Sequence, residues 1–262
     1  MKYAVVVLLA AVVVLGRVGS SVGQNPIPHR PPRGFVYPYS NNCNAPVEFK
    51  AFIDLSCPDC KQAWPTFQKV AAFYSNASIS VLSFEAILFP LPFHRAAFPA
   101  AQASYILRLL REAAAYPWFD YIFEHQSKYY NGATLNLTQS EIDVMLAKDI
   151  SSATGISMSD ILTHFKDSDP SREEEIVMWK YACSMTVSGT PTVFVNGVRV
   201  DFSLTWTLDD WRKVIDPLLE PEDVYYMRKT CPAGQKLCKY LPGKTECCLK
   251  GEFCIPNVGC RC

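Results

Sequence analysis

The spacing of apolar and polar residues predicts alternating strands and helices between residue 43 and about residue 222. The segment VEFKAFIDL (47–55) mixes apolar, β-branched and aromatic residues, which is typical of a strand. A helix is expected to begin at Pro58, because the first helical position needs no N–H, and Pro65 is expected to kink it. The apolar residues of this helix recur at spacings of three and four: Ala63, Trp64, Phe67, Val70, Ala71 and Tyr74.

The rest of this region continues the pattern. SISVLSFEAIL (78–88) predicts a second strand, and residues 99–187 are expected to be mostly helical. PTVFVNGVRV (191–200) predicts two strands joined by a tight Asn-Gly turn, and a last helix is expected from about Leu208 to Leu219. Helix caps are predicted at Thr138 or Ser140 followed by Glu141, and at Ser171 followed by Glu174.

The two ends differ in composition from this globular region. Lys2, the apolar stretch 4–15 and the small residues after it predict a signal peptide over 1–23, too short in its apolar part to span a bilayer. Residues 24–42 are rich in Pro and Asn and predict an extended linker. Sequons at Asn76 and Asn136 are expected to carry glycans if the host glycosylates them.

Charge and cysteine content narrow the class of protein. The chain has 25 basic and 25 acidic residues, and this balance argues against nucleic-acid binding. Eleven cysteines are typical of a protein from an oxidising compartment. The sequence therefore favours a location in the secretory pathway or outside the cell, with no membrane span once the signal is removed.

Cys57 and Cys60, in DLSCPDCKQAWP, allow three interpretations. A zinc half-site needs a second ligand pair, and no further Cys-x-x-Cys or paired histidines follow, so no metal site is predicted. An inert structural bridge remains open. Their placement favours a redox pair. The helix N-terminus stabilises a thiolate at Cys57. Cys60 lies one turn later, where it can resolve a mixed disulfide formed at Cys57.

Several segments resemble the thioredoxin fold and, within it, the DsbA-like disulfide oxidoreductases. They are FIDLSCPDCK with Pro65 beyond it, FPLPFHRAAFPAAQA (89–103) and VSGTPTVFVNG (187–197). The resemblance covers residues 43 to about 220 and implies an α/β fold with a helical insertion over about 99–187. It also implies that Pro191 is cis and that the backbone of Thr190 receives a substrate chain as an added strand; an ordinary trans turn is the alternative.

Two positions depart from the family pattern. Asp59 lies between the cysteines where strongly oxidising members carry histidine, and its charge is expected to raise the pKa of Cys57 relative to that type. A simple helix-capping role for Asp59 is the alternative. Ala51 occupies the position of a buried acid found in many relatives, so proton transfer at Cys60 is expected to use water or Asp54.

Three other residues invite interpretation. Trp64 is expected to lie in the core. His94 lies in a loop after the second predicted strand, from which it could approach the site. A lone histidine is more often structural, so His94 is not placed among the catalytic residues. Cys183 is expected to be buried or bridged.

Residues 228–262 hold seven cysteines and form a separate module. Six of them resemble the knottin pattern, which implies the pairs Cys231–Cys248, Cys238–Cys254 and Cys247–Cys260 and leaves Cys262 over. A passive, disulfide-stabilised cap and a partner-binding module are both open.

Taken together, the resemblance implies a thiol–disulfide oxidoreductase that acts on cysteine-containing client proteins through Cys57 and Cys60, with Thr190 and Pro191 at the substrate and Pro58 and Asp59 as modulators. It needs no organic cofactor, because the cysteine pair carries the electrons, and its redox partner is unknown. The alternative is a redox-inactive secreted binding protein in which the α/β domain is a scaffold and the cysteine-rich tail binds a partner.

Overall fold

A computed structural model describes residues 33–37, 45–75, 80–220, 236–241, 244–248, 253–255 and 259–261. The predicted signal peptide, the sequon at Asn76 and most of the predicted linker lie outside the described residues. Within 45–220 the observed order of elements is the predicted one: strand, helix, strand, helical block, hairpin, helix.

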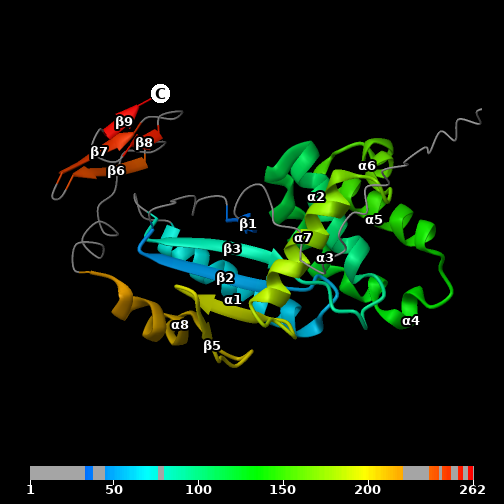
Figure 1. Cartoon of the computed structure of the whole chain (residues 1–262), viewed down its shortest axis with the longest axis horizontal. Coiled ribbons are helices and arrows are strands. Elements are labelled where there is room, and N and C mark those ends of the chain that lie inside the picture. The colour runs from blue at the N-terminus through cyan, green and yellow to red at the C-terminus, as the bar shows by residue number, and fades with distance from the viewer. Residues whose placement is uncertain are drawn as a thin grey trace, which may run out of the picture.

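A mixed five-stranded sheet forms the centre of the domain, in the order β1-β3-β2-β4-β5 (Figure 1). β2 pairs in parallel with β3, and the remaining neighbours are antiparallel. β2 and β3 are both shorter than the predicted strands 47–55 and 78–88. The strands are β1 (Phe35–Val36), β2 (Val47–Ile53), β3 (Leu82–Leu88), β4 (Thr192–Val195) and β5 (Val198–Val200).

Helices cover both faces of this sheet. Phe49 of β2 packs against Trp211 of α8 (Leu208–Ile215), with ring centroids 4.9 Å apart, and also against α1 (Pro58–Ser75). Phe52 contacts Tyr181 of α7 (Pro170–Ser184). Positions 49 and 52 differ by an odd number, so their side chains point to opposite faces of the strand. α1 and α8 therefore cover one face, and α7 covers the other.

The predicted helical block is an insertion between β3 and α7, and it lies beyond the carboxyl ends of β2 and β3 (Figure 1). Its central helix, α2, packs against α3, α5, α6 and α7. The elements are α2 (Ala97–Arg111), η1 (Glu112–Ala114), α3 (Ala115–Glu124), η2 (Gln126–Tyr129), α4 (Asn131–Thr134), α5 (Gln139–Thr154) and α6 (Met158–His164).

Local signals explain where several elements begin and end. The capping box predicted at Thr138 and Glu141 is present, and Asn196 and Gly197 both adopt positive φ in the predicted tight turn between β4 and β5. The cap predicted at Ser171 is wrong. The cap is Asp169 and α7 begins at Pro170, each two residues earlier than predicted, because the carboxylate of Asp169 accepts the Ser171 N–H and proline suits the first helical position.

The last helix is also shorter than predicted. α8 ends at Ile215, and the turn that follows, η3 (Asp216–Leu218), is a 3-10 helix. Pro217 accounts for this change, because proline has no N–H to continue the α-helical hydrogen bonding.

The predicted linker 24–42 is wrong for residues 33–37, which belong to the folded domain. Phe35 and Val36 form β1 and pair with Ala86 and Glu85 of β3. Phe35 is buried, so its burial against the core explains why this short segment is ordered on the sheet. Gly34 fits there because a Cβ atom would lie 2.7 Å from the Ala86 carbonyl oxygen.

The cysteine-rich tail contains two short antiparallel pairs. β6 (Lys236–Leu241) pairs with β7 (Lys244–Cys248), and β8 (Phe253–Ile255) pairs with β9 (Gly259–Arg261). The predicted disulfide Cys238–Cys254 is confirmed, and Cys248 is also disulfide-bonded. The pairings Cys231–Cys248 and Cys247–Cys260 stay predictions.

No helix in the described part of the chain combines the length and the apolar character needed to cross a membrane. Asn136, the second sequon, is exposed in the turn before α5.

Candidate active site

The turn between β2 and α1 places Cys57 at the start of a helix. The Cys57 N–H donates to the Asp54 carbonyl at 3.0 Å, and the Cys57 carbonyl accepts the Lys61 N–H at 3.1 Å. Cys57 is therefore the residue immediately before α1, where the first N–H groups of the helix have no intrahelical acceptor. A negative charge on its sulfur is stabilised by these groups and by the helix dipole.

The two cysteines differ in their surroundings. Both are free thiols; Cys57 keeps 5% of its surface accessible, and Cys60 keeps none. A hydrogen bond with the Cys60 thiol, with further help from Thr190 and from the backbone of Cys60 and Asp59, lowers the pKa of Cys57 to about 6. Burial raises the pKa of Cys60 well above its usual value. The pair is thus divided into a slightly accessible, ionisable thiol and a fully buried, protonated one.

The loop before β4 lies directly against Cys57. The Cys57 thiol donates to the Thr190 carbonyl oxygen at 3.4 Å, although the two residues are 133 positions apart. The peptide bond between Thr190 and Pro191 is cis, as the resemblance implied. Both residues are half-buried, so this loop and the Cys57 thiol share one accessible edge of the domain.

Asp54 and His94 form a second pair beside the cysteines. Asp54 is fully buried, and its carboxylate accepts the Ser56 N–H at 2.7 Å and the Leu91 N–H at 3.1 Å. The Nδ1 atom of His94 lies 2.6 Å from the same carboxylate. The hydrogen bond to Asp54 is the main reason that the pKa of His94 is raised.

Sequence reasoning left His94 out of the site, although one signal was present. Asp54 directly follows β2, and His94 follows β3, the parallel neighbour of β2. The carboxyl ends of parallel strands meet at one edge of a sheet, so residues that follow two such strands are brought together.

Gln126 connects the helical insertion to the active-site turn. Its side chain is fully buried, and its Nε2 atom donates to the carbonyl oxygens of Leu55 and Cys57, each at 2.9 Å. Its Oε1 atom accepts the Tyr130 hydroxyl at 2.8 Å. The insertion therefore holds the backbone on which Cys57 is carried, which sequence reasoning did not anticipate.

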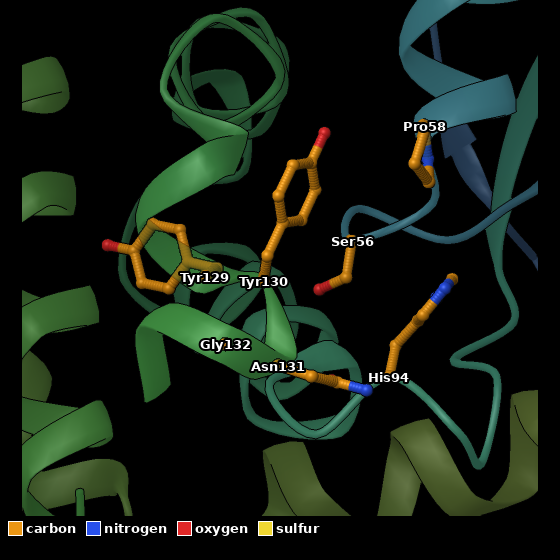
Figure 2. A pocket seen from close by; sticks show the side chains of 7 residues that line it. All are labelled: Ser56, Pro58, His94, Tyr129, Tyr130, Asn131 and Gly132. Carbon is orange, nitrogen blue, oxygen red and sulfur yellow. The ribbon is translucent and has the colours of Figure 1, made fainter. Parts of the chain in front are cut away.

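A pocket of about 280 Å³ opens beside Cys57, between this turn and the insertion. Figure 2 shows Tyr130 and the turn bearing Ser56 and Pro58 facing one another across it, with the His94 imidazole directed toward that turn. The residues lining it are Ser56, Pro58, His94, Tyr129, Tyr130, Asn131 and Gly132. The pocket thus has aromatic, amide and imidazole groups next to the turn that carries Cys57.

The remaining predicted residues have clear positions. Pro58 and Asp59 are exposed on the first turn of α1, and Ala51 is buried in β2. Trp64 is 2% exposed and packs among Tyr116, Phe119 and Phe123, so its predicted core position is confirmed.

Cys183 differs from its prediction. It is a half-buried free thiol on α7, not a fully buried or bridged one. Burial raises the pKa of its thiol, whereas the pKa of Cys57 is lowered. The structure therefore separates Cys183 chemically from the Cys57–Cys60 pair.

Solved structures with the same architecture come from bacterial proteins. A candidate protein-disulfide isomerase of Pseudomonas syringae matches 70% of this chain and 97% of its own, with a TM-score of 0.56 and 15% identity. Oxidised BdbD of Bacillus subtilis matches 71% of this chain and 96% of its own, with a TM-score of 0.55 and 19% identity. Alpha-DsbA1 of Wolbachia pipientis matches 74% of this chain and 92% of its own, with a TM-score of 0.55 and 15% identity. These similarities establish a DsbA-like thioredoxin fold.

No curated protein is similar enough in sequence to count as a relative. The family model described as thioredoxin matches residues 40–217, which include both cysteines of the turn and the Thr190–Pro191 loop. Since this match spans more than half of the chain, the protein belongs to the thioredoxin family.

Proposed function

We propose that this protein is a thiol–disulfide oxidoreductase of the secretory pathway or the extracellular space, acting on cysteines of client proteins. One observation carries the proposal: the Cys57 sulfur lies at the N-terminus of α1, 3.4 Å from the Thr190 carbonyl, with a pKa lowered to about 6 and the buried Cys60 behind it. A thiolate is the nucleophile and the better leaving group in disulfide exchange.

In the oxidising direction, a client thiolate attacks the Cys57 sulfur of the Cys57–Cys60 disulfide. The client–Cys57 bond forms, the Cys57–Cys60 bond breaks, and Cys60 takes up a proton. A second client thiolate then attacks the client sulfur of this mixed disulfide and releases Cys57 as a thiolate. Two electrons pass from the client to the pair, and the client gains a disulfide. A redox partner that accepts these electrons restores the starting state.

Thr190 supports the placement of the client chain. In the reduced form with Cys57 protonated, its carbonyl oxygen accepts the Cys57 S–H. When the Cys57 sulfur is bonded to a client, it has no proton to donate, and the carbonyl becomes available to an N–H of the bound chain. An extended client segment is then held by backbone contacts, which suits an enzyme with many clients.

The proposed compartment fits the disulfide chemistry of the tail. Cys238 and Cys254 are joined, and disulfides of this kind persist where the surroundings are oxidising. The same compartment supplies client proteins whose cysteines pair during folding.

Two assays test the proposal: reduction of insulin and reoxidation of reduced ribonuclease. We expect Cys57→Ser to lose at least about 100-fold in rate, because the attacking sulfur is gone. Cys60→Ser is expected to accumulate a client-bound mixed disulfide that non-reducing electrophoresis detects, because the resolving thiol is absent.

Cys183→Ser is the matched control, since it removes a free thiol of α7 that lies outside the proposed pair. Its rates should equal those of the wild type. A wild type inactive in both assays would reject the enzyme and leave the scaffold interpretation, in which the tail binds a partner.

A further inference from the structure

His94 is held in one orientation by a buried carboxylate. The Asp54 carboxylate is fixed by the N–H groups of Ser56 and Leu91 and is fully buried. His94 Nδ1 faces it at 2.6 Å, which leaves the Nε2 edge of the ring directed away from Asp54. A buried carboxylate in contact with an imidazole favours the protonated ring.

The ring is also close to the reactive cysteine. His94 shares the pocket with Ser56 and Pro58, the two chain neighbours of Cys57, and points toward their turn (Figure 2). The charge on Cys57 contributes to the raised pKa of His94. Since electrostatic coupling acts equally on both partners, a charged His94 stabilises a charged Cys57.

We propose that His94, positioned by Asp54, supplies the positive charge that stabilises the Cys57 thiolate, and that it is therefore a positioning residue for disulfide exchange. This inference rests on the proposed oxidoreductase function. The segment Cys57-Pro58-Asp59-Cys60 holds no basic residue, and its one charged side chain is acidic. The fold thus brings a cation to the sulfur from the loop that follows β3.

Other ionisable groups around His94 are engaged elsewhere. The Tyr129 hydroxyl donates to Asp149, and the Tyr130 hydroxyl donates to Gln126. The Arg95 guanidinium donates to backbone carbonyls of the insertion, among them that of Leu135. Cys60 is buried with a raised pKa, and Asp59 is exposed on α1. Asp54 and Cys57 are therefore the groups whose charges act most directly on the ring.

The pH range of the effect follows from the directions of the two shifts. The pKa of Cys57 is about 6, and that of His94 is raised above its usual 6.5. Above pH 6 the thiolate forms while the imidazole is still protonated, so the two opposite charges coexist. As the pH rises through the pKa of His94, the ring becomes neutral and this stabilisation is lost.

The first experiment measures the Cys57 thiolate by its absorbance at 240 nm across a pH titration of the reduced full chain. We expect His94→Gln to raise the pKa of Cys57 by about one unit, which is the order of shift that a nearby opposite charge produces. The matched control is His164→Gln. His164 forms the same kind of pair with Asp169, at 2.8 Å, but lies at the end of α6. The His164→Gln substitution should therefore leave the pKa of Cys57 unchanged.

Thermal melting of both variants separates stability from this effect. Loss of either histidine–aspartate pair is expected to lower the melting temperature, but only loss of His94 is expected to shift the thiolate titration. A folded His94→Gln variant with an unchanged Cys57 pKa would overturn the proposal.

The second experiment does not require a His94 variant to fold. NMR titration of the His94 ring in the reduced wild type and in Cys57→Ser measures the same coupling from the other side. The pKa of His94 should fall when the thiolate is removed, and an unchanged value would also overturn the proposal. Neither measurement depends on turnover. Failure of the activity assays with intact coupling would therefore reject the proposed function alone.

Discussion

Asp59 lies between the two cysteines, exposed on the first turn of α1. Its backbone helps to lower the pKa of Cys57, and its side chain places a carboxylate two positions along the chain from the same residue. A negative charge near a thiolate disfavours it. The pKa of Cys57 is nevertheless lowered to about 6, because the hydrogen bonds to the sulfur, first that from Cys60, outweigh the effect of burial.

Replacement of Asp59 tests how much oxidising strength its charge removes. Asp59→His is expected to lower the pKa of Cys57 and to make the pair more oxidising, by up to about one pKa unit, or about 1.4 kcal/mol of added thiolate stabilisation. Asp59→Asn, which removes only the charge, should give a smaller change of the same sign. The reduction potential against a glutathione buffer measures both. An equally or less oxidising histidine variant would refute the role given to the charge.

Gln126, in η2, shows how one element of the insertion stabilises another part of the molecule. Its side chain donates to two backbone carbonyls of the active-site turn, those of Leu55 and Cys57. Cys57 lies 69 residues before it in the chain. Buried carbonyl groups that lose their donors cost about 1–3 kcal/mol each. The insertion is therefore a structural support of the turn as well as a wall of the pocket.

Gln126→Ala is expected to lower the free energy of unfolding by about 2–3 kcal/mol, because two buried acceptors are left without partners. Urea denaturation measures this. The control is Gln139→Ala, whose side chain donates to Asp143 on the exposed face of α5 and is expected to change stability by less than about 0.5 kcal/mol. Equal effects of the two substitutions would contradict the supporting role of Gln126.

The redox state of the pair is expected to change the stability of the whole molecule with pH. The pKa of Cys57 falls from its usual 9.0 to about 6 on folding. A group with a lowered folded-state pKa stabilises the protein above that value, and the effect is fully present above the unfolded-state pKa. Reduced protein therefore gains stability from Cys57 as the pH rises from 6 to 9.

Thermal melting of reduced wild type and reduced Cys57→Ser checks this expectation. The wild type should gain melting temperature relative to the variant between pH 5 and pH 8, because only the wild type forms the thiolate. His94 has the opposite pH dependence, because a group whose pKa is raised on folding stabilises the protein at low pH. Its contribution is present in both proteins. A difference that is constant with pH would contradict the lowered pKa of Cys57.

The tail depends on its cross-links for order. Cys238 and Cys254 close a loop with a sequence separation of 16, for which a disulfide contributes about 3 kcal/mol. We expect Cys238→Ser combined with Cys254→Ser to make the tail sensitive to trypsin, which cleaves after lysines such as Lys239. Insulin reduction should stay within about twofold of the wild type if Cys57 and Cys60 suffice for the chemistry. Proteolysis followed by mass spectrometry compares the two proteins, and an equally resistant variant would contradict this view of the tail.

Local signals in the sequence determined much of the architecture. β2, α1, the hairpin at Asn196-Gly197 and the cap at Thr138 follow from apolar periodicity, from backbone dihedral preferences and from side chains that reach neighbouring N–H groups. Each of these signals acts over a few residues. The placement of Cys57 at a helix N-terminus has the same origin. The predicted linker failed at β1 because its order comes from pairing with β3, which is distant in the chain.

The surroundings of Cys57 were decided only by tertiary structure. His94 meets Asp54 across 40 residues, Gln126 meets Cys57 across 69, and Thr190 meets it across 133. These contacts depend on the parallel pairing of β2 with β3 and on the packing of the insertion beyond their ends. The Thr190 loop was expected only through its resemblance to the family, and apolar periodicity marks neither His94 nor Gln126, because their contacts arise only when the whole domain has folded.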